Sequence, residues 1–204
     1  HLEGAEDIAE AARLERMVSV SAALGSRIFK IFPGRVASDS ADAATWTRTV
    51  DRLRTLGQRV TAEDMMLTLE THGGTLCDSL DSTLRLLDDL ADCADVGVCL
   101  QPYTDDDTDQ TIATFDALGD RVRHLHLQNR DTHRTMTLLA EGDWTDYRRY
   151  LPHVVSAGFD GALCIEFTAG IVPQEGATFD LTTVLGNAML DRRFVESQWH
   201  GSER

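Results

Sequence analysis

The chain has 204 residues, of which 34 are acidic and 19 basic, giving a formal net charge of −15 at pH 7. This charge opposes binding to nucleic acid and to anionic membranes, and we interpret it as a solvated acidic surface. No stretch approaches the roughly 18 apolar residues of a membrane span, and no signal peptide is recognisable, so we expect a cytoplasmic protein. The four cysteines have no CxxC spacing, and we interpret them as buried free thiols in a reducing compartment.

Amphipathic helices alternate with short buried strands along the chain. The first half predicts a helix over 4–24, a strand over 27–32, a helix from a cap at Ser40 or Asp42 to Gly57, a strand over 65–70 and a helix over 76–93. The second half predicts a strand over 96–101, a helix over 108–118, a strand over 121–129, a helix from Trp144 to Gly158, a strand over 162–167 and a helix over 179–194. Strand starts that recur roughly every 25–40 residues favour βα units in a parallel sheet.

The strand over 121–129 has an unusual pattern. Leu125 and Leu127 share one parity, whereas His124, His126 and Gln128 share the other and are expected to point inward. A buried neutral imidazole needs a hydrogen-bond partner or a metal. A hydrogen-bonded core histidine is the simpler interpretation of one isolated residue, but polar residues at other strand ends favour a metal site.

Four polar residues stand at or near the ends of predicted strands: Glu70, Gln101, His126 and Glu166. In parallel α/β folds the functional side chains lie at the carboxyl ends of strands. Two carboxylates, an amide and an imidazole suit a divalent cation such as Mn²⁺, Mg²⁺ or Co²⁺, with Zn²⁺ as a further option. Glu70 could instead cap a helix or join a salt bridge, and Gln101, a neutral and poorer ligand, could orient a water or the substrate.

Three further residues are candidates for substrate binding. His72 follows the strand that ends at Glu70, His124 precedes His126 on the same face, and Arg130 lies just beyond the central strand. The simpler interpretations are a surface-loop histidine for His72 and an ion pair with Asp131 for Arg130. Residues 129–142 have no clear periodicity, and a connection of that length is often functional.

The motifs Leu-Thr-Leu-Glu70-Thr-His-Gly-Gly, Val-Gly-Val-Cys-Leu-Gln101-Pro, His124-Leu-His126-Leu-Gln and Leu-Cys-Ile-Glu166-Phe occur in this order between residue 27 and about residue 170. Together they resemble the xylose isomerase-like TIM-barrel superfamily, and within it the sugar phosphate isomerase/epimerase group. The resemblance implies that Glu70, His126 and Glu166 bind a metal on barrel strands five, seven and eight. Gln101 stands where that family has Asp on strand six, which removes one negative charge. Thr104 stands where the family usually has a substrate-binding His.

The resemblance implies an α/β fold of the (β/α)8 TIM-barrel type. A complete barrel needs about 250 residues, and on this alignment the strand over 27–32 is the fourth. We therefore expect one domain over residues 1–204, an incomplete barrel that covers the last five βα units, with the N-terminal strands missing before His1. An open parallel edge exposes backbone groups, so we expect a partner there, such as a second copy in a homo-oligomer.

The activity that the resemblance implies is that of a divalent-metal-dependent sugar or sugar phosphate isomerase or epimerase. Glu70 and Glu166 would act as an acid/base pair on opposite sides of a substrate carbon, through an enediolate. The expected partner is a small sugar, with no nucleic acid and no membrane. Two alternatives stay open: a catalytically degenerate barrel that binds a sugar or serves as a structural subunit, and an endonuclease IV-like phosphodiesterase, which the charge of −15 disfavours.

Overall fold

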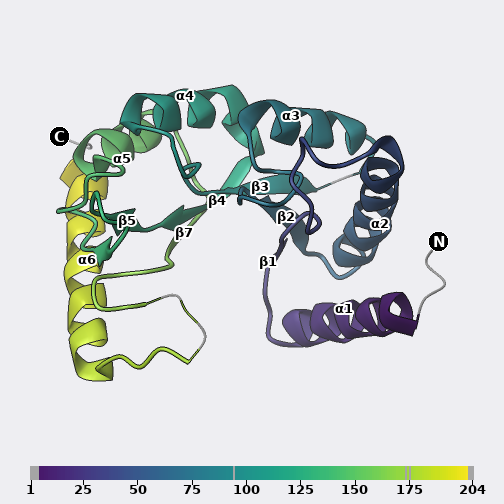
Figure 1. Cartoon of the computed structure of the whole chain (residues 1–204), viewed down its shortest axis with the longest axis horizontal. Coiled ribbons are helices and arrows are strands. Elements are labelled where there is room, and N and C mark those ends of the chain that lie inside the picture. Colours follow the sequence, from purple (N-terminus) through teal and green to yellow (C-terminus); the bar gives the residue numbers. More distant parts are fainter. Residues whose placement is uncertain (1–4, 94, 173, 175, 202–204) are drawn as a thin grey trace. The chain divides into compact units, whose positions relative to one another are not determined.

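The structure is a computed structural model that describes residues 5–93, 95–172, 174 and 176–201. The chain forms two compact units, the first ending at residue 98 and the second beginning at residue 99 (Figure 1). Residue 1, before which the missing strands were predicted, and residue 4, the predicted start of the first helix, lie outside the described residues.

The first unit alternates helices and strands in the predicted order. Its elements are α1 (Ala5–Ala23), β1 (Ile28–Ile31), α2 (Ala43–Thr61), β2 (Met66–Glu70), α3 (Leu80–Asp89) and the start of β3 (Val96–Leu100). Strand β1 pairs with β2 in parallel, with Ile28 opposite Met66 and Ile31 opposite Leu69. The core packs Leu67 and Leu69 of β2 against apolar residues of α2, which explains the continuous apolar run before Glu70.

Helices α2 and α3 of this unit differ from the sequence-based prediction at their ends, and α3 ends at Asp89 where residue 93 was predicted. Helix α2 is capped by Asp42, whose side chain accepts a hydrogen bond from the Thr45 N–H, and it continues past Gly57 to Thr61. Gly57 lies inside the helix, facing Val96 and Leu67, so its small size serves packing and not chain reversal. Helix α3 begins only after its cap, Ser79, because the turn before it buries Leu76 and Cys77.

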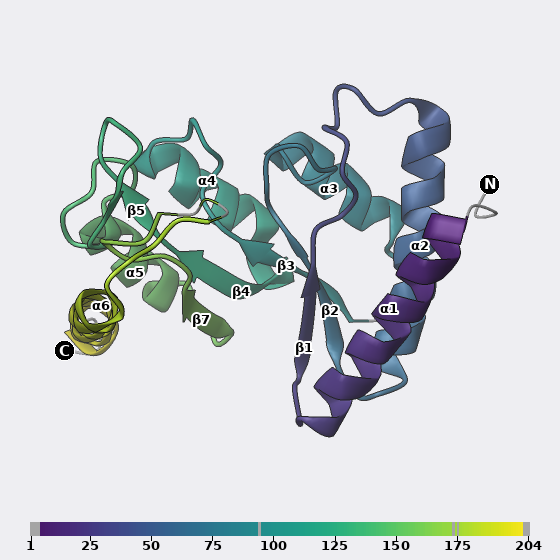
Figure 2. The same cartoon turned by 60° about the horizontal axis from the view of Figure 1, so that its bottom comes forward.

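The second unit contains the end of β3, a short 3-10 helix at Gly119–Arg121 and the remaining elements. These are α4 (Thr108–Leu118), β4 (Val122–Leu127), β5 (Asn129–Arg130), β6 (Met136–Thr137), α5 (Tyr147–Ser156), β7 (Ala162–Ile165) and α6 (Leu181–Gly201). The strands lie in the order β3-β4-β7 (Figure 2). Strand β4 pairs with β7 in parallel, with His124 opposite Ala162 and His126 opposite Cys164. This register places the inward residues of β4 beside the strand that leads to Glu166.

Several predictions differ from the structure in detail, and the one for the cysteines concerns both units. Helix α6 begins at Leu181 and continues past residue 194, its predicted end, to Gly201. Helix α5 begins after its cap, Asp146, so Trp144 lies in the preceding loop. The segment 129–142 contains the antiparallel pair β5–β6, whose two-residue strands are too short to give a periodic pattern. Cys164 is exposed and Cys93 half-buried, so only Cys77 and Cys99 are the buried thiols that were expected. Among the described strands, β7 pairs only with β4.

The α/β class is confirmed. Five parallel strands, each followed by helical structure, are consistent with an incomplete TIM barrel of βα units. Within the part of the chain that the structure describes, no helix combines the length and the apolar character that a bilayer crossing requires.

Candidate active site

The polar ends of β3, β4 and β7 meet in one hydrogen-bonded network in the second unit. The side-chain amide of Gln128 donates from Nε2 to Gln101 Oε1 at 2.7 Å and to Glu166 Oε2 at 2.9 Å. The same carboxylate oxygen lies 3.4 Å from Nδ1 of His126. Gln101, His126 and Gln128 are buried, whereas 23% of the Glu166 side chain is exposed. Glu166 is therefore the member of this network that solvent or a ligand can reach.

Arg130 extends the network from the other side of Gln128. Its Nη2 donates to Gln128 Oε1 at 3.0 Å, and its guanidinium carbon lies 4.9 Å from the centroid of the Trp144 ring. Burial lowers the pKa of Arg130, nearby Arg134 lowers it further, and the Glu166 carboxylate opposes both effects. Arg130 thus fixes which end of the Gln128 amide faces Glu166.

Asp131 does not provide the ion pair that was the simpler interpretation of Arg130. Its carboxylate instead accepts hydrogen bonds from the backbone N–H groups of His133 and Thr135. These bonds lower the pKa of Asp131. Substrate binding by Arg130 stays a prediction.

The backbone that carries Gln128 is held from two sides. The Tyr147 hydroxyl donates to the Gln128 carbonyl at 2.9 Å. Asn129, which is fully buried, donates from Nδ2 to the carbonyls of Leu139 and Thr145 at 3.0 and 2.8 Å. A side chain at Gly142 would meet Asn129, since a Cβ there would lie 2.2 Å from its Cγ. The segment after β4 is therefore anchored to the strand end, and neither Asn129 nor Tyr147 was identified from the sequence.

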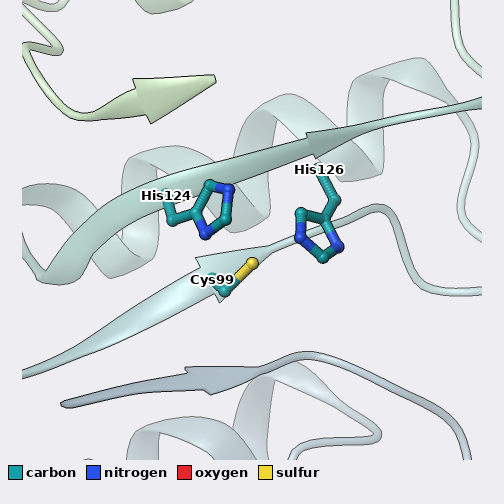
Figure 3. Close-up of side chains that lie close together, drawn as sticks. All are labelled: Cys99, His124 and His126. Atoms are coloured by element: carbon teal, nitrogen blue, oxygen red, sulfur yellow. The ribbon is translucent and has the colours of Figure 1, made fainter. Parts of the chain in front are cut away.

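His124 lies beside this network. Its ring is half-buried and perpendicular to that of His126, with centroids 4.7 Å apart. Figure 3 shows both rings projecting from β4 toward Cys99 of β3. The inward parity of His124 and His126 is confirmed, and a substrate contact of His124 stays a prediction.

The first unit places Glu70 at the end of β2 in an ion pair. The Glu70 side chain is 0% exposed, and its Oε2 accepts a hydrogen bond from Nζ of Lys30 on β1, a side chain that is 30% exposed. The salt bridge considered for Glu70 is therefore present. Lys30 was not identified from the sequence, although a lysine inside the run Ile-Phe-Lys-Ile-Phe signals a buried charge that needs a partner.

His72 follows Glu70 in the first unit and is exposed. Its Nδ1 lies 2.7 Å from the Gly73 carbonyl oxygen, and its ring meets the Phe32 ring edge-on with centroids 4.9 Å apart. The position fits the loop histidine that was the simpler interpretation, and its role toward a substrate stays a prediction.

The structure thus brings Gln101, His126, Glu166 and Arg130 together around Gln128, and it places Glu70 and His72 in the first unit. In octahedral coordination at about 2.1–2.2 Å, neighbouring ligand atoms lie about 3.0 Å apart. The 3.4 Å between His126 Nδ1 and Glu166 Oε2 is close to that value, so this imidazole and carboxylate fit one divalent cation.

The sequence matches the xylose isomerase-like TIM barrel family over residues 1–182, and the chain belongs to that family. The match runs through both compact units. No curated protein matches the chain in sequence.

Solved structures with the same fold include several enzymes. A D-tagatose 3-epimerase-like protein is 12% identical with a TM-score of 0.71, over 98% of this chain and 73% of its own. A xylose isomerase-like TIM barrel protein from Mycobacterium smegmatis, solved in complex with magnesium, is 15% identical with a TM-score of 0.69, over 99% and 71%. The probable 3-DHS dehydratase AsbF of petrobactin synthesis from Bacillus anthracis is 20% identical with a TM-score of 0.65, over 80% and 66%. The chain thus spans about two thirds to three quarters of their length, and at these identities the likeness is one of fold.

Proposed function

We propose that this chain is, or is the larger part of, a divalent-metal-dependent isomerase or epimerase of a sugar or sugar phosphate. The observation that carries the proposal is the network on β3, β4 and β7, in which a partly exposed Glu166 stands 3.4 Å from a buried imidazole. Membership of the family and the fold shared with an epimerase-like protein support it. Because the neighbours include a probable dehydratase, the fold alone does not select the reaction.

Glu166 and His126 would hold the metal, with Glu70 and Gln101 as the further ligands that the strand ends provide. The carboxyl ends of parallel strands in a TIM barrel gather at one face, and Glu70 stands at such an end, so we include it among the metal ligands. When bound, Mn²⁺, Mg²⁺ or Co²⁺ would supply positive charge beside the carbonyl oxygen of the sugar, where negative charge develops. The single acidic group lost at Gln101 favours a weaker site than one with three carboxylates.

Glu166 and Glu70 would divide the proton transfer between them. Gln128 holds Oε2 of Glu166, so Oε1 is the oxygen left to take a proton from the carbon next to the carbonyl. Glu70 would deliver a proton from the other side. The ammonium of Lys30, which is hydrogen-bonded to Glu70, would supply the proton that Glu70 passes on, and Lys30, 30% exposed, would recover it from solvent.

The proposal also covers the substrate contacts and the assembly state of the chain. His72, His124 and Arg130 would contact the sugar hydroxyls or a phosphate. The assembly would be a homo-oligomer in a cytoplasmic setting.

Hydrogen exchange tests this proposal across many sugars at once, so the substrate need not be identified beforehand. The chain is freed of metal with a chelator, loaded with Mn²⁺ or Mg²⁺, and incubated in D2O with a panel of aldoses, ketoses and their phosphates. We expect deuterium to enter at the carbon next to the carbonyl of at least one sugar, as followed by NMR, and the exchange to stop when the metal is removed. Glu166→Gln should lose the exchange, whereas a matched change at exposed Glu63, Glu63→Gln, should keep it.

Two outcomes would overturn the proposal. One is the absence of exchange for every sugar in a metal-loaded chain that is folded by circular dichroism. The other is exchange that continues at the same rate in the Glu166→Gln variant.

The Lys30–Glu70 pair favours one second candidate, a barrel that binds a sugar without converting it. A lysine that already neutralises Glu70 makes a metal less necessary there. In that case calorimetry with the same panel would detect binding of a sugar that undergoes no exchange, and binding would persist after the metal is removed.

A further inference from the structure

A sulfur atom and two imidazoles lie together inside the second unit. Cys99 on β3 and His124 and His126 on β4 each offer one ligand atom, and these three atoms lie within 4.8 Å of one another. Figure 3 shows the Cys99 sulfur pointing toward the two rings. Cys99 is 0% and His126 5% exposed, while His124 is half-buried. The cluster is thus largely shielded from water, and its donors come from adjacent strands.

We propose that Cys99, His124 and His126 form a binding site for a soft or borderline divalent cation of the Zn²⁺ class. Thiolate and imidazole are the ligands that zinc takes, whereas Mg²⁺ and Mn²⁺ prefer carboxylate, carbonyl and water oxygens. One thiolate and two neutral rings leave a net positive charge on the complex and a fourth position for water or a ligand atom.

The geometry needs only a modest contraction to bind zinc. With Zn–S near 2.3 Å and Zn–N near 2.0–2.1 Å, tetrahedral donors lie about 3.3–3.6 Å apart. Donors that lie within 4.8 Å of one another reach that spacing if the widest pair closes by about 1–1.5 Å, which side-chain rotations about χ1 and χ2 can provide. Strand pairing fixes the backbones that carry them, so the cluster is held together before any ion arrives.

This site is distinct from the oxygen-rich site of the proposed function, although the two share His126. Cys99 lies two residues before Gln101, which directly follows β3, and His124 lies two residues before His126 on β4. The two sites therefore follow each other along the strands. The inference rests on the donors of the cluster and does not depend on the isomerase proposal. Because two cations on the one His126 ring would require the loss of its remaining N–H proton, zinc in the inner site should compete with Mn²⁺ at the outer one.

Cobalt provides the test, because Co²⁺ takes the same ligands as zinc and reports a thiolate by its charge-transfer absorption in the near ultraviolet. The full chain, freed of metal and kept reduced, is titrated with CoCl2 and then with ZnCl2. We expect about one Co²⁺ per chain, a thiolate charge-transfer band, visible bands of tetrahedral cobalt, and loss of all of them when Zn²⁺ is added.

Variants separate this site from other metal ligands. Cys99→Ser should abolish the charge-transfer band, and His124→Gln should weaken Co²⁺ binding by more than the roughly 10- to 100-fold that loss of an outer partner costs. The matched control Cys93→Ser removes a half-buried thiol of the first unit and should keep the band. Glu166→Gln alters the outer site and should also keep it. The fold of each variant is checked by circular dichroism, and Cys99→Val serves as an apolar replacement if the serine variant does not fold.

The result that would overturn the inference is a folded wild-type chain that shows no charge-transfer band at saturating Co²⁺. A band of unchanged intensity in Cys99→Ser or Cys99→Val would do the same. Failure of the isomerase proposal leaves these measurements unaffected, since they report ligation and not turnover.

Discussion

The two carboxylates at the ends of β2 and β7 occupy very different surroundings. Glu70 is completely buried and held by the ammonium of Lys30. Glu166 is 23% exposed and held by the neutral amide of Gln128, with the His126 ring 3.4 Å away. One carboxylate is thus fixed by a charge, and the other is oriented by a hydrogen bond that leaves it accessible.

This difference suggests how a pair of glutamates can take different roles in proton transfer. A carboxylate that is partly exposed and held only on one oxygen can approach a substrate and change its protonation state. A buried carboxylate in an ion pair is held in place by its partner, so any proton that it delivers comes through the lysine. Variants at these positions and their neighbours test whether Glu166 takes the proton from the substrate and Glu70 delivers one with the help of Lys30.

The largest expected effect is on turnover. Glu166→Gln keeps the shape of the side chain and removes its ability to take a proton. We expect a loss of about 10²–10⁴-fold in kcat for any sugar that the wild-type chain converts. Single-turnover kinetics measure this, and a Tm within a few degrees of wild type shows that the fold is kept. If kcat fell less than threefold, Glu166 would not be the base.

The next effect is on stability and concerns Glu70. Lys30→Met removes the ammonium and leaves Glu70 as a buried charge. Breaking a buried pair costs about 3–5 kcal/mol, and we expect the lower end because Lys30 is 30% exposed. Urea unfolding measures the change in the free energy of unfolding.

The double variant Lys30→Met/Glu70→Gln provides the control for that effect. It removes the charge as well as its partner and should recover most of the lost stability. A double variant no more stable than Lys30→Met would show that the cost comes from lost packing of the lysine stem and not from the loss of the ion pair.

A smaller effect is expected for the amide that orients Glu166. Gln128→Leu removes the hydrogen bonds to Gln101, Glu166 and Arg130 at once. Loss of such an orienting partner costs about 10- to 100-fold in activity or metal affinity. Kinetics and Mn²⁺ titration measure it, with Gln58→Leu on the exposed face of α2 as the matched change. Equal activity in the two variants would contradict an orienting role.

The smallest effect concerns a second buried carboxyl, Asp191, which accepts hydrogen bonds from the Leu139 N–H at 2.7 Å and the Thr168 hydroxyl at 2.5 Å. Burial raises the pKa of Asp191 above its ordinary 3.8, and these hydrogen bonds only partly oppose the shift. The folded state therefore keeps the proton to higher pH than the unfolded chain. This contribution to stability is complete below about pH 3.8 and is lost as the pH rises through the folded pKa.

Asp191→Asn tests that direction, because the amide is neutral at all pH values and can accept from Leu139 while donating to Thr168. The stability of the wild type relative to the variant should fall as the pH rises from about 4 to 7. Urea unfolding at several pH values measures it. A relative stability that rises over this range would mean that hydrogen bonding outweighs burial.

The sequence contains most of what is needed to predict the fold. Apolar runs that end in Glu70, Gln101 and His126 gave the strands, because residues on buried parallel strands have few alternatives to apolar side chains. The boundaries of α4 were predicted correctly, since Asp107 and Gln110 form a capping box that marks its start. The early stop assigned at Gly57 was wrong because a glycine inside a helix can serve close packing instead of chain reversal.

The site residues at the strand ends could be predicted from the sequence. The residues that hold them in place by hydrogen bonds were harder to predict. Parity pointed Gln128 inward, but its hydrogen bonds to Gln101 and Glu166 depend on which strands are neighbours, and spacing does not determine that. Asn129 and Tyr147 support the strand end from positions 18 residues apart, by contacts that exist only after the loop has folded. Lys30 lay in an apolar strand run, and a search for buried charges without an assigned partner would have identified it.

The central claim, that a divalent cation binds where Glu166 and His126 meet, is tested most directly by a crystal of the chain grown or soaked with Mn²⁺. Anomalous scattering at the manganese edge locates the ion without reference to any activity. We predict one strong peak about 2.0–2.3 Å from a Glu166 oxygen and a His126 nitrogen. A crystal saturated with Mn²⁺ that shows no anomalous peak between these two side chains would contradict the claim.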